Sequence, residues 1–392
     1  MSPLLQKAFN FFGIVTFAIY STIAFASPNV NRISGKVFHN ESIIISGYNF
    51  SVKPTPEPVV WDNLEDGACN TSATIGKWAS INNLKITKFN QRHSNSIYNA
   101  GLNFTSEAWG NFTGGSDSPR WYVQYWFYLA SDFNFSSDIH NNLGNIKIFR
   151  LWSTGNTSNN LRVQLLSMYT SDLVVEAVDT AHGGYKVGWT PVNKFYKTID
   201  QTLGHAAPRE ILGGDLGWHF YKTDISTGRW HLFQFEFIES SLNSYDGILK
   251  WWYDGNLIVD VDNVRTRTST HPSSMRPAVV GFYNSHGKGA DGNDHFYIDD
   301  AYIDNILARV EIGNSSNYNS CTLREIQIPT FWSDKSISVT VNQGAFKTGD
   351  TAYIFVIDLD GRKSPGHQIV IGESNNTQYS YLPKVQLNSI IQ

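Results

Sequence analysis

The sequence is poor in cysteine and in charge, and both shortages narrow the possible classes of protein. Two cysteines among 392 residues exclude a disulfide-rich scaffold. Charged residues make up 16% of the chain, against about 25% in a typical globular protein, and the net charge is −4. Such a chain has no general electrostatic attraction for nucleic acid or for anionic membranes, so neither is expected as a partner.

Long apolar runs are also scarce, and the one that exists lies at the N-terminus. Residues 1–26 contain Lys7, then an apolar run that ends in Ala24-Phe25-Ala26. This pattern is typical of a secretory signal peptide cleaved near Ser27. No later run reaches the roughly 18–20 residues that a membrane span needs. We therefore expect a secreted protein, extracellular or periplasmic, with no membrane insertion after cleavage.

The remaining apolar residues alternate with polar ones, as they do in β-strands. No segment has a long helical period. Short alternating segments bounded by Gly, Asn, Asp or Ser recur instead, for example WYVQYWFYLA (121–130), KIFRLW (147–152), HLFQFEFI (231–238) and HFYIDDAYID (295–304). The sequence therefore predicts an all-β fold, built as a sandwich.

The two ends of the chain carry motifs that belong together. ISGYNF (45–50), WSDKSISVTV (332–341) and VIDLDGRKS (356–364) resemble the two halves of an IPT/TIG-type immunoglobulin-like domain. The resemblance implies a split domain formed by residues 27–58 and 322–392, with residues 59–321 inserted between its halves. The alternative is a separate C-terminal sandwich preceded by a loose N-terminal arm.

The two cysteines lie near the entry and the exit of the predicted insert. In an oxidising compartment a lone pair of cysteines usually bonds, so we expect a Cys69–Cys321 disulfide at the neck of the insert. Such a bond would close a long loop and constrain the unfolded chain. The alternative is two buried thiols.

The insert resembles the concanavalin A-like jelly roll. The resemblance lies in the opening VVWDNLEDG (59–67), the hairpin YDGILKWWYDGNLIVDV (245–261) and the closing FYIDDAYID (296–304). It implies a jelly-roll sandwich, a fold shared by lectins, laminin-G-type modules, carbohydrate-binding modules and several polysaccharide lyases. A fold with so many functions does not by itself define a reaction.

Acidic residues cluster on the first and last strands of the insert. Hard oxygen ligands of this kind suit calcium, and the related binding modules use such a site structurally. The expected cofactor is therefore a structural Ca²⁺, and the alternative is that these carboxylates cap strands and accept bonds from loop amides. The candidate ligands are Asp62, Glu65, Asp66, Asp299 and Asp300.

Polar and aromatic residues alternate with the predicted core residues on several strands. If Phe149 and Leu151 face the core, Arg150 and Trp152 face away from it. Indoles stack on sugar rings and arginines bind carboxylates, so this face is interpreted as a concave polysaccharide-binding groove, with Arg265, Arg267 and Arg276 favouring an acidic chain. The alternative is an ordinary covered sheet face. The candidate set is Gln124, Trp126, Arg150, Trp152, Arg162, Gln164, Gln234, Glu236 and Trp252.

Motifs for catalysis are mostly missing. No HExxH, G-x-S-x-G or paired-carboxylate run of the jelly-roll glucanases occurs. A β-eliminating lyase needs a cation to neutralise a uronate and a Tyr or His as base. In this hypothesis Arg150, Arg162 and Gln164 would neutralise the uronate carboxylate, and Tyr128 or His231 would act as the base. The sequence signatures of the alginate-lyase-like families are absent. The first hypothesis is a polysaccharide-binding protein, the second a polysaccharide lyase, and the third a surface adhesion or structural protein.

Overall fold

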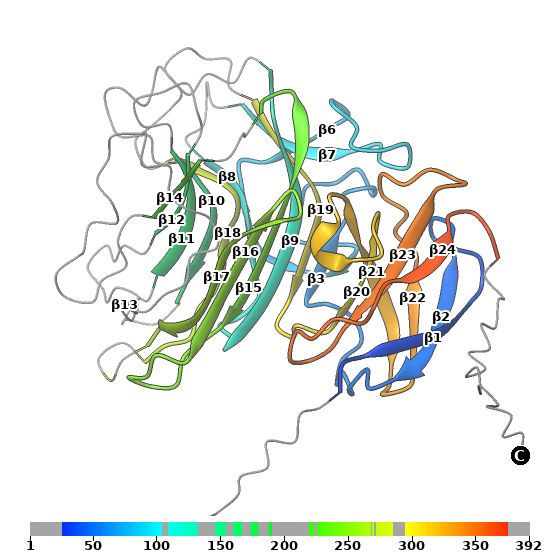
Figure 1. Cartoon of the computed structure of the whole chain (residues 1–392). Helices are drawn as coiled ribbons and strands as arrows, with labels where there is room; N and C mark the ends of the chain where they lie inside the picture. Colours follow the sequence, from blue (N-terminus) through cyan, green and yellow to red (C-terminus); the bar gives the residue numbers. More distant parts are fainter. Residues whose placement is uncertain are drawn as a thin grey trace, which may run out of the picture.

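The computed structural model describes residues 26–103, 109–131, 146–153, 160–166, 174–178, 188–189, 219–222, 226–267, 269, 272–284 and 295–374. These residues form strands β1 to β24 and one short 3₁₀ turn, η2 (Tyr318–Ser320) (Figure 1). The fold is therefore all β, as the alternating segments predicted. In these ranges no helical segment has the length and hydropathy needed to span a bilayer. The predicted signal peptide, residues 1–26, lies almost wholly outside them.

Two antiparallel sheets form a jelly-roll sandwich. We call them the β10 sheet and the β9 sheet. The β10 sheet has the order β14 (His219–Lys222), β12 (Val174–Val178), β11 (Asn160–Leu166), β10 (Ile146–Trp152), β18 (Arg276–Asn284), β8 (Trp109–Gly114) and β5 (Trp78–Asn82). The β9 sheet has the order β13 (Gly188–Trp189), β17 (Asn256–Arg265), β16 (Gly247–Tyr253), β15 (Arg229–Ile238), β9 (Arg120–Leu129), β19 (His295–Asp304), β3 (Val60–Asp62) and β4 (Ile75–Gly76), with β7 (Asn99–Asn103) beside β19 and β6 (Lys85–Thr87) beside β7.

The core of the sandwich lies between these two sheets. Phe149 of β10 packs on Phe235 of β15, with ring centres 4.6 Å apart. The hydroxyl of Tyr125 on β9 donates a hydrogen bond of 2.5 Å to the carbonyl of Ile148. Alternate residues of β15, including Phe233, Phe235 and Phe237, are fully buried in this core. The alternation of apolar and polar residues in the sequence therefore predicts which side chains of these strands point into the core.

A third sheet joins the two ends of the chain, and we call it the terminal sheet. Its order is β1 (Asn29–Ser34), β2 (Ser42–Tyr48), β22 (Ser336–Thr340), β21 (Arg324–Trp332), β20 (Arg309–Gly313), β23 (Thr351–Ile357) and β24 (His367–Val370). β21 bends at a bulge near Pro329, pairing with β20 through its first half and with β22 through its second. The N-terminal strands thus share one core with the C-terminal strands.

The pairing of β2 with β22 brings residues nearly 300 positions apart into register, since Ile45 lies opposite Ile337. The indole of Trp332 also donates to the carbonyl of Phe50 at 3.2 Å. β20 lies inside the range 59–321 predicted for the insert, yet it belongs to the terminal sheet. We call β1, β2 and β20–β24 the terminal unit, and the sandwich of β3–β19 the jelly-roll unit. Whether the terminal unit is an IPT/TIG-type domain with the predicted boundaries stays a prediction.

The predicted disulfide is not present, and both cysteines are free thiols. Cys69 packs against the jelly-roll core, whereas Cys321 packs with Tyr318 and Phe355 beside the terminal sheet. Burial, with the charges of two nearby carboxylates, raises the pKa of the Cys69 thiol to about 12. The alternative of two buried thiols holds for Cys321, whereas Cys69 is only half-buried.

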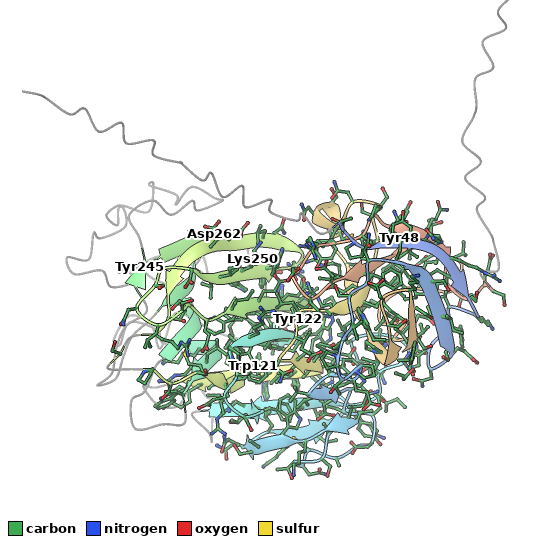
Figure 2. The ribbon with its side chains drawn as sticks, turned by 90° about the horizontal axis from the view of Figure 1, so that it is seen from below. Tyr48, Trp121, Tyr122, Tyr245, Lys250 and Asp262 are labelled. Carbon is green, nitrogen blue, oxygen red and sulfur yellow. The ribbon has the colours of Figure 1, made fainter. Side chains whose placement is uncertain are left out.

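Two arginines of the terminal unit bind the outer face of the β9 sheet. The guanidinium of Arg309 lies 2.9 Å from Glu236 of β15 and 2.5 Å from Glu311 of β20, and its central carbon is 3.7 Å from the ring centre of Tyr122. Tyr122 follows the core residue Trp121 on β9 and so faces the terminal unit (Figure 2). All of these side chains are buried.

Arg324 completes this network. It donates to the side-chain oxygen of Gln234 on β15 and lies 3.3 Å from the second oxygen of Glu311. Gln234 in turn donates to the hydroxyl of Tyr122 at 2.9 Å. Burial disfavours the charge of Glu311, but the two arginines outweigh it and hold its pKa below the usual value. The two units are thus joined by a buried, mutually neutralised network rather than by apolar contact alone.

Replacing Arg309 should therefore destabilise the protein strongly. Arg309→Ala leaves the buried Glu236 without its paired arginine and Glu311 with Arg324 alone, and breaking a buried pair in this way typically costs about 3–5 kcal/mol of unfolding free energy. The matched control is Arg229→Ala, because Arg229 pairs with Asp254 at 2.8 Å but its side chain is 49% exposed. Exposed pairs contribute at most about 1 kcal/mol. Urea unfolding of both variants measures the difference, and equal losses would contradict the importance of the buried network.

Candidate functional site

The β10 strand carries cationic and aromatic side chains on the face of its sheet that points away from the core. A bulge between Lys147 and Phe149 interrupts the alternation, so that Ile148 and Phe149 both enter the core. Lys147 consequently shares the outer face with Arg150 and Trp152. Lys147 and Arg150 are buried, whereas the side chain of Trp152 is 38% exposed.

The arginine and the tryptophan stack on one another. The guanidinium carbon of Arg150 lies 3.9 Å from the centre of the Trp152 ring. Stacking of this kind holds the indole in place, because a cation is attracted to the face of an aromatic ring. The strand thus holds an exposed aromatic surface against a buried cation.

The neighbouring strand β18 adds a tyrosine. Tyr283 lies opposite Lys147 in the ladder, and the lysine nitrogen is 5.1 Å from the centre of its ring. Arg276 lies opposite Trp152. Lys147 and Tyr283 were not among the predicted site residues, because strict alternation along 147–152 places Lys147 in the core. Nothing in the sequence marks the bulge that reverses it.

Strand β8 supports this face from the other side of β18. The side chains of Asn111 and Thr113 donate to the carbonyl of Ala278 at 3.2 and 3.0 Å. Ala278 lies at a second bulge, where the register of β10 against β18 shifts. The freed carbonyl is thus satisfied by side chains, which fixes the local shape of the sheet.

The predicted groove residues lie on two different sheets. Arg150 and Trp152 lie on β10, and the ladder places Arg162 and Gln164 of β11 opposite Arg150 and Lys147. The side chains of Arg162 and Gln164 lie outside the described residues. The other five candidates lie on β9, β15 and β16 of the β9 sheet, across the core from β10; they are Gln124, Trp126, Gln234, Glu236 and Trp252. A single groove lined by all nine residues is therefore wrong.

The five residues on the β9 sheet are buried by the terminal unit and its neighbours. Gln234 and Glu236 bind Arg324 and Arg309, as described above. Gln124 accepts hydrogen bonds from Tyr122 and Gln234 at 2.7 and 3.1 Å. The polar residues of this face were predicted to line a binding groove, but in the structure they make contacts between the two units.

The two tryptophans of that set are buried as well. Arg92 lies over the Trp126 ring, with 4.6 Å between the guanidinium carbon and the ring centre. The side chain of Trp252 is 4% exposed, and it lies opposite Gln234 in the ladder. Neither indole is therefore placed to stack on a sugar.

The two residues predicted as the lyase base are not at the β10 face. His231 is fully buried, with its ring nitrogens 2.9 Å from Asp254 and 2.7 Å from the carbonyl of Ser226. It therefore holds the end of β15 rather than facing a substrate. Tyr128 lies on β9, where its ring meets Trp230 and Tyr297 at 5.5 and 5.8 Å.

The carboxylates predicted to bind calcium are occupied by protein groups. Asp62 accepts from the indole of Trp78 at 2.7 Å and from the amide of Leu64. Glu65 accepts from the amides of Ile97 and Tyr98. Asp66 accepts from the amide of Ala68 at 2.9 Å, and so caps its own turn.

The last two carboxylates, Asp299 and Asp300, occupy a bulge of β19 and are also engaged. Asp299 accepts from Ser96 at 2.8 Å, and Asp300 is paired with Arg92. Burial disfavours the charge of Asp300, but Arg92 outweighs it and holds the pKa at about 2. Burial and the neighbouring Asp300 raise the pKa of Asp299 well above its usual value.

These five carboxylates do not fit a calcium ion in this arrangement. Within the described ranges, no group of three or more His, Cys, Asp or Glu residues is arranged to hold a metal. The carboxylates instead cap loops and pair with Arg92, which is the alternative that the sequence left open. Calcium binding stays a prediction of the sequence alone.

Comparison with known proteins gives structural neighbours only, since no family model and no curated protein matches the chain. The alginate lyase Aly36B is 12% identical with a TM-score of 0.40, covering 64% of this chain and 97% of that one. The glucuronan lyase of the fungus Trichoderma reesei is 14% identical with a TM-score of 0.37, covering 61% and 95%. The alginate lyase of Aplysia kurodai is 12% identical with a TM-score of 0.38, covering 65% and 98%. The structural neighbours thus include polysaccharide lyases.

Asp62 should make stability depend on pH. Burial raises its pKa to about 6, above the unfolded value of 3.8. A raised folded pKa means that its contribution is fully present below pH 3.8 and is lost as the pH rises through 6. The loss is about 3 kcal/mol, because each pKa unit corresponds to about 1.4 kcal/mol. Urea unfolding between pH 4 and 7.5 should show this decline relative to Asp62→Asn, which cannot ionise.

The matched control for this measurement is Asp246→Asn. A hydrogen bond from Ser241 lowers the pKa of Asp246, so its contribution is lost as the pH falls rather than as it rises. A decline of the same sign and size in both comparisons would show that the burial of Asp62 is not its cause.

Proposed function

We propose that the outer face of the β10 sheet binds an acidic polysaccharide. The observation that supports this is the stack of Arg150 and Trp152 beside Lys147 and Tyr283. An indole presents an apolar face to a sugar ring, and an arginine matches the geometry of a carboxylate. Because the indole is exposed and the guanidinium of Arg150 lies 3.9 Å from its ring centre, a sugar that stacks on Trp152 would carry its carboxylate close to Arg150.

The position of the cations in the fold strengthens the proposal. Lys147 and Arg150 lie on one strand and are held by its bulge, so both charges are fixed before a ligand arrives. A preorganised site loses less conformational freedom on binding. The ladder also places the backbone of Arg162 opposite that of Arg150.

A second candidate is β-elimination at the same face, supported by the closeness of Tyr283 to Lys147. In such a reaction a base removes the proton next to the uronate carboxylate while a cation neutralises that carboxylate. The electron pair left behind forms a carbon–carbon double bond as the bond to the oxygen of the leaving sugar breaks, and that oxygen takes up a proton. The phenol of Tyr283 and the cations Lys147 and Arg150 supply these groups. Tyr283 would therefore be the catalytic base, the role for which the sequence offered Tyr128 or His231.

Gel retardation and ultraviolet absorbance separate these candidates. The purified protein is run in gels containing alginate, polyglucuronate or a neutral glucan, and the same mixtures are followed for the absorbance of unsaturated uronides. Retardation by a polyuronate, without absorbance, is the result expected for a binding protein. Absorbance that rises and is lost in Tyr283→Phe, with retardation kept, would establish elimination.

The decisive variant is Trp152→Ala, which removes the exposed aromatic surface. We expect binding to a polyuronate to weaken about tenfold, or 1.4 kcal/mol. The control is Phe331→Ala, because Phe331 is 51% exposed on the terminal sheet and far from β10 in the fold. Unchanged binding in Trp152→Ala, or the absence of retardation by every polyuronate, would overturn the proposed function.

A further inference from the structure

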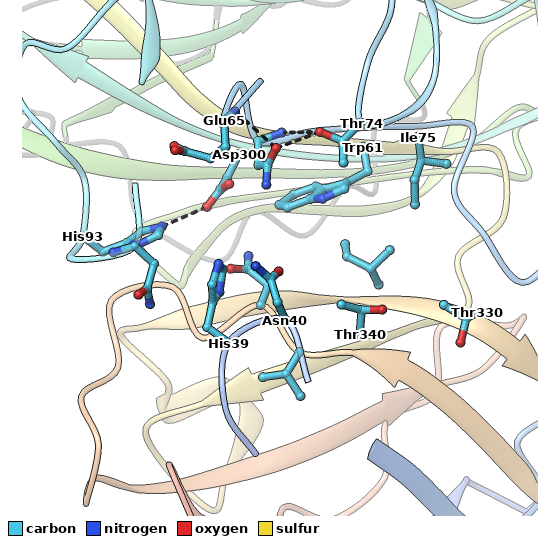
Figure 3. A pocket seen from close by; sticks show the side chains of 15 residues that line it. His39, Asn40, Trp61, Glu65, Thr74, Ile75, His93, Asp300, Thr330 and Thr340 are labelled. Atoms are coloured by element: carbon cyan, nitrogen blue, oxygen red, sulfur yellow. Dashed lines mark hydrogen bonds and ion pairs between the residues drawn. The ribbon is translucent and has the colours of Figure 1, made fainter. Parts of the chain in front are cut away.

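A cavity of about 180 Å³ lies between the jelly-roll unit and the terminal unit (Figure 3). The turn between β1 and β2, the start of the jelly roll, the 92–96 segment, the bulge of β19 and the strands β21 and β22 all contribute to it. It lies on the β9 side of the sandwich, across the core from Trp152. Its lining includes His39, Trp61, Asn63, His93, Asp300 and Asn342.

Three buried polar atoms at this cavity have no hydrogen-bond partner within the described part of the chain. They are Nδ1 of His39, Nε2 of His93 and Nδ2 of Asn342. The side chain of His93 is 5% exposed, and so is Asn342. A buried polar group without a partner costs about 1–3 kcal/mol, so three such atoms at one cavity call for an explanation.

The hydrogen bond at Nδ1 of His93 shows which ring nitrogen carries the proton in the neutral ring. Nδ1 lies 3.1 Å from the amide of Asn95, which donates to it, so in the neutral ring the proton is on Nε2. Nε2 lies 3.5 Å from an oxygen of Asp300, too far for a good hydrogen bond. The Nε2–H of His93 therefore lies at the cavity in a long contact with Asp300, which Figure 3 shows, and makes no short hydrogen bond.

The charged side chains at the cavity are already engaged by other groups of the protein. Asp300 forms an ion pair with Arg92, and the carboxylate of Glu65 accepts hydrogen bonds from two loop amides. Burial and the neighbouring His93 lower the pKa of His39, which keeps its ring neutral. A strongly charged ligand therefore has no matching partner here.

The walls combine apolar and polar surfaces. Trp61 and Ile75 both line it (Figure 3), and Ile328 of β21 belongs to the same hydrophobic cluster as Trp61. The hydroxyl of Thr74 donates to Asn63 at 2.7 Å, which leaves the amide group of Asn63 as a donor. Apolar patches between convergent donors and acceptors are the usual environment of a small ligand.

We propose that this cavity binds one neutral sugar residue, either a free monosaccharide or the end of a glycan chain. A sugar ring matches it in three respects: hydroxyl groups would satisfy His39, His93 and Asn342, the apolar face of the ring would lie on Trp61, and the volume suits a single ring. Drug-sized sites are larger, at about 300–1,000 Å³. This site is separate from the β10 face and does not depend on the function proposed for that face.

Ligand-observed NMR with the mature full-length protein tests the proposal. Saturation transfer is measured to glucose, galactose, mannose, xylose and arabinose in turn, and calorimetry then gives the affinity of any sugar that responds. We expect at least one neutral monosaccharide to bind. His39→Ala and Asn63→Ala, which change half-buried side chains at the cavity, should each weaken binding by about fivefold through the loss of a hydrogen bond.

Two controls make the outcome decisive. His367→Ala removes a half-buried histidine of β24 that lies outside the cavity, near the carbonyl of Val30. Trp152→Ala alters the β10 face alone. Both should leave monosaccharide binding unchanged. No response to any sugar, which would mean that water alone fills the cavity, or a response lost in Trp152→Ala but kept in His39→Ala, would overturn the proposal.

Discussion

The buried network of Arg309 and Arg324 with Glu236 and Glu311 is the interaction on which the rest of the structure depends. Two guanidinium groups of the terminal unit reach two buried strands of the jelly-roll unit, and each charge is neutralised within about 3 Å. Removing any one member would leave an uncompensated charge away from water. The network therefore fixes how the two units lie against each other more strictly than apolar packing alone would.

This arrangement decides which surfaces remain for a ligand. The terminal unit covers the polar outer face of the β9 sheet, including Gln124, Gln234 and Glu236. The β10 sheet lies across the core and keeps an exposed indole, Trp152, above the buried Arg150. The polar residues that hold the two units together therefore lie on the β9 sheet, whereas those proposed to bind a polysaccharide lie on the β10 sheet.

The same docking also creates the cavity between the units. Arg92 pairs with Asp300 of the jelly roll and, at 2.8 Å, with Glu325 of β21, so it joins both units at the edge of the cavity. His39 and His93 come from segments far apart in the chain and meet with ring centres 6.5 Å apart. A site built from both units exists only when the units are docked, so its ligand would also favour the docked state.

Several features follow from the sequence by itself. Alternation with a period of two gave the all-β class and the inward residues of β15, because successive side chains of a strand point to opposite faces. It also placed Arg150 and Trp152 together on one outer face. The motifs at the two ends pointed to strands that the structure pairs as β2 with β22.

The tertiary structure decided what alternation could not. A bulge at Lys147 moved that side chain to the outer face and brought it to Tyr283, and no residue type in the strand announces a bulge. Outward residues of the β9 sheet are polar whether they face water, a ligand or another unit, so only docking showed that Glu236 meets Arg309. Sequence fixes which face of a strand a side chain occupies, but what that face meets depends on contacts between segments far apart in the chain.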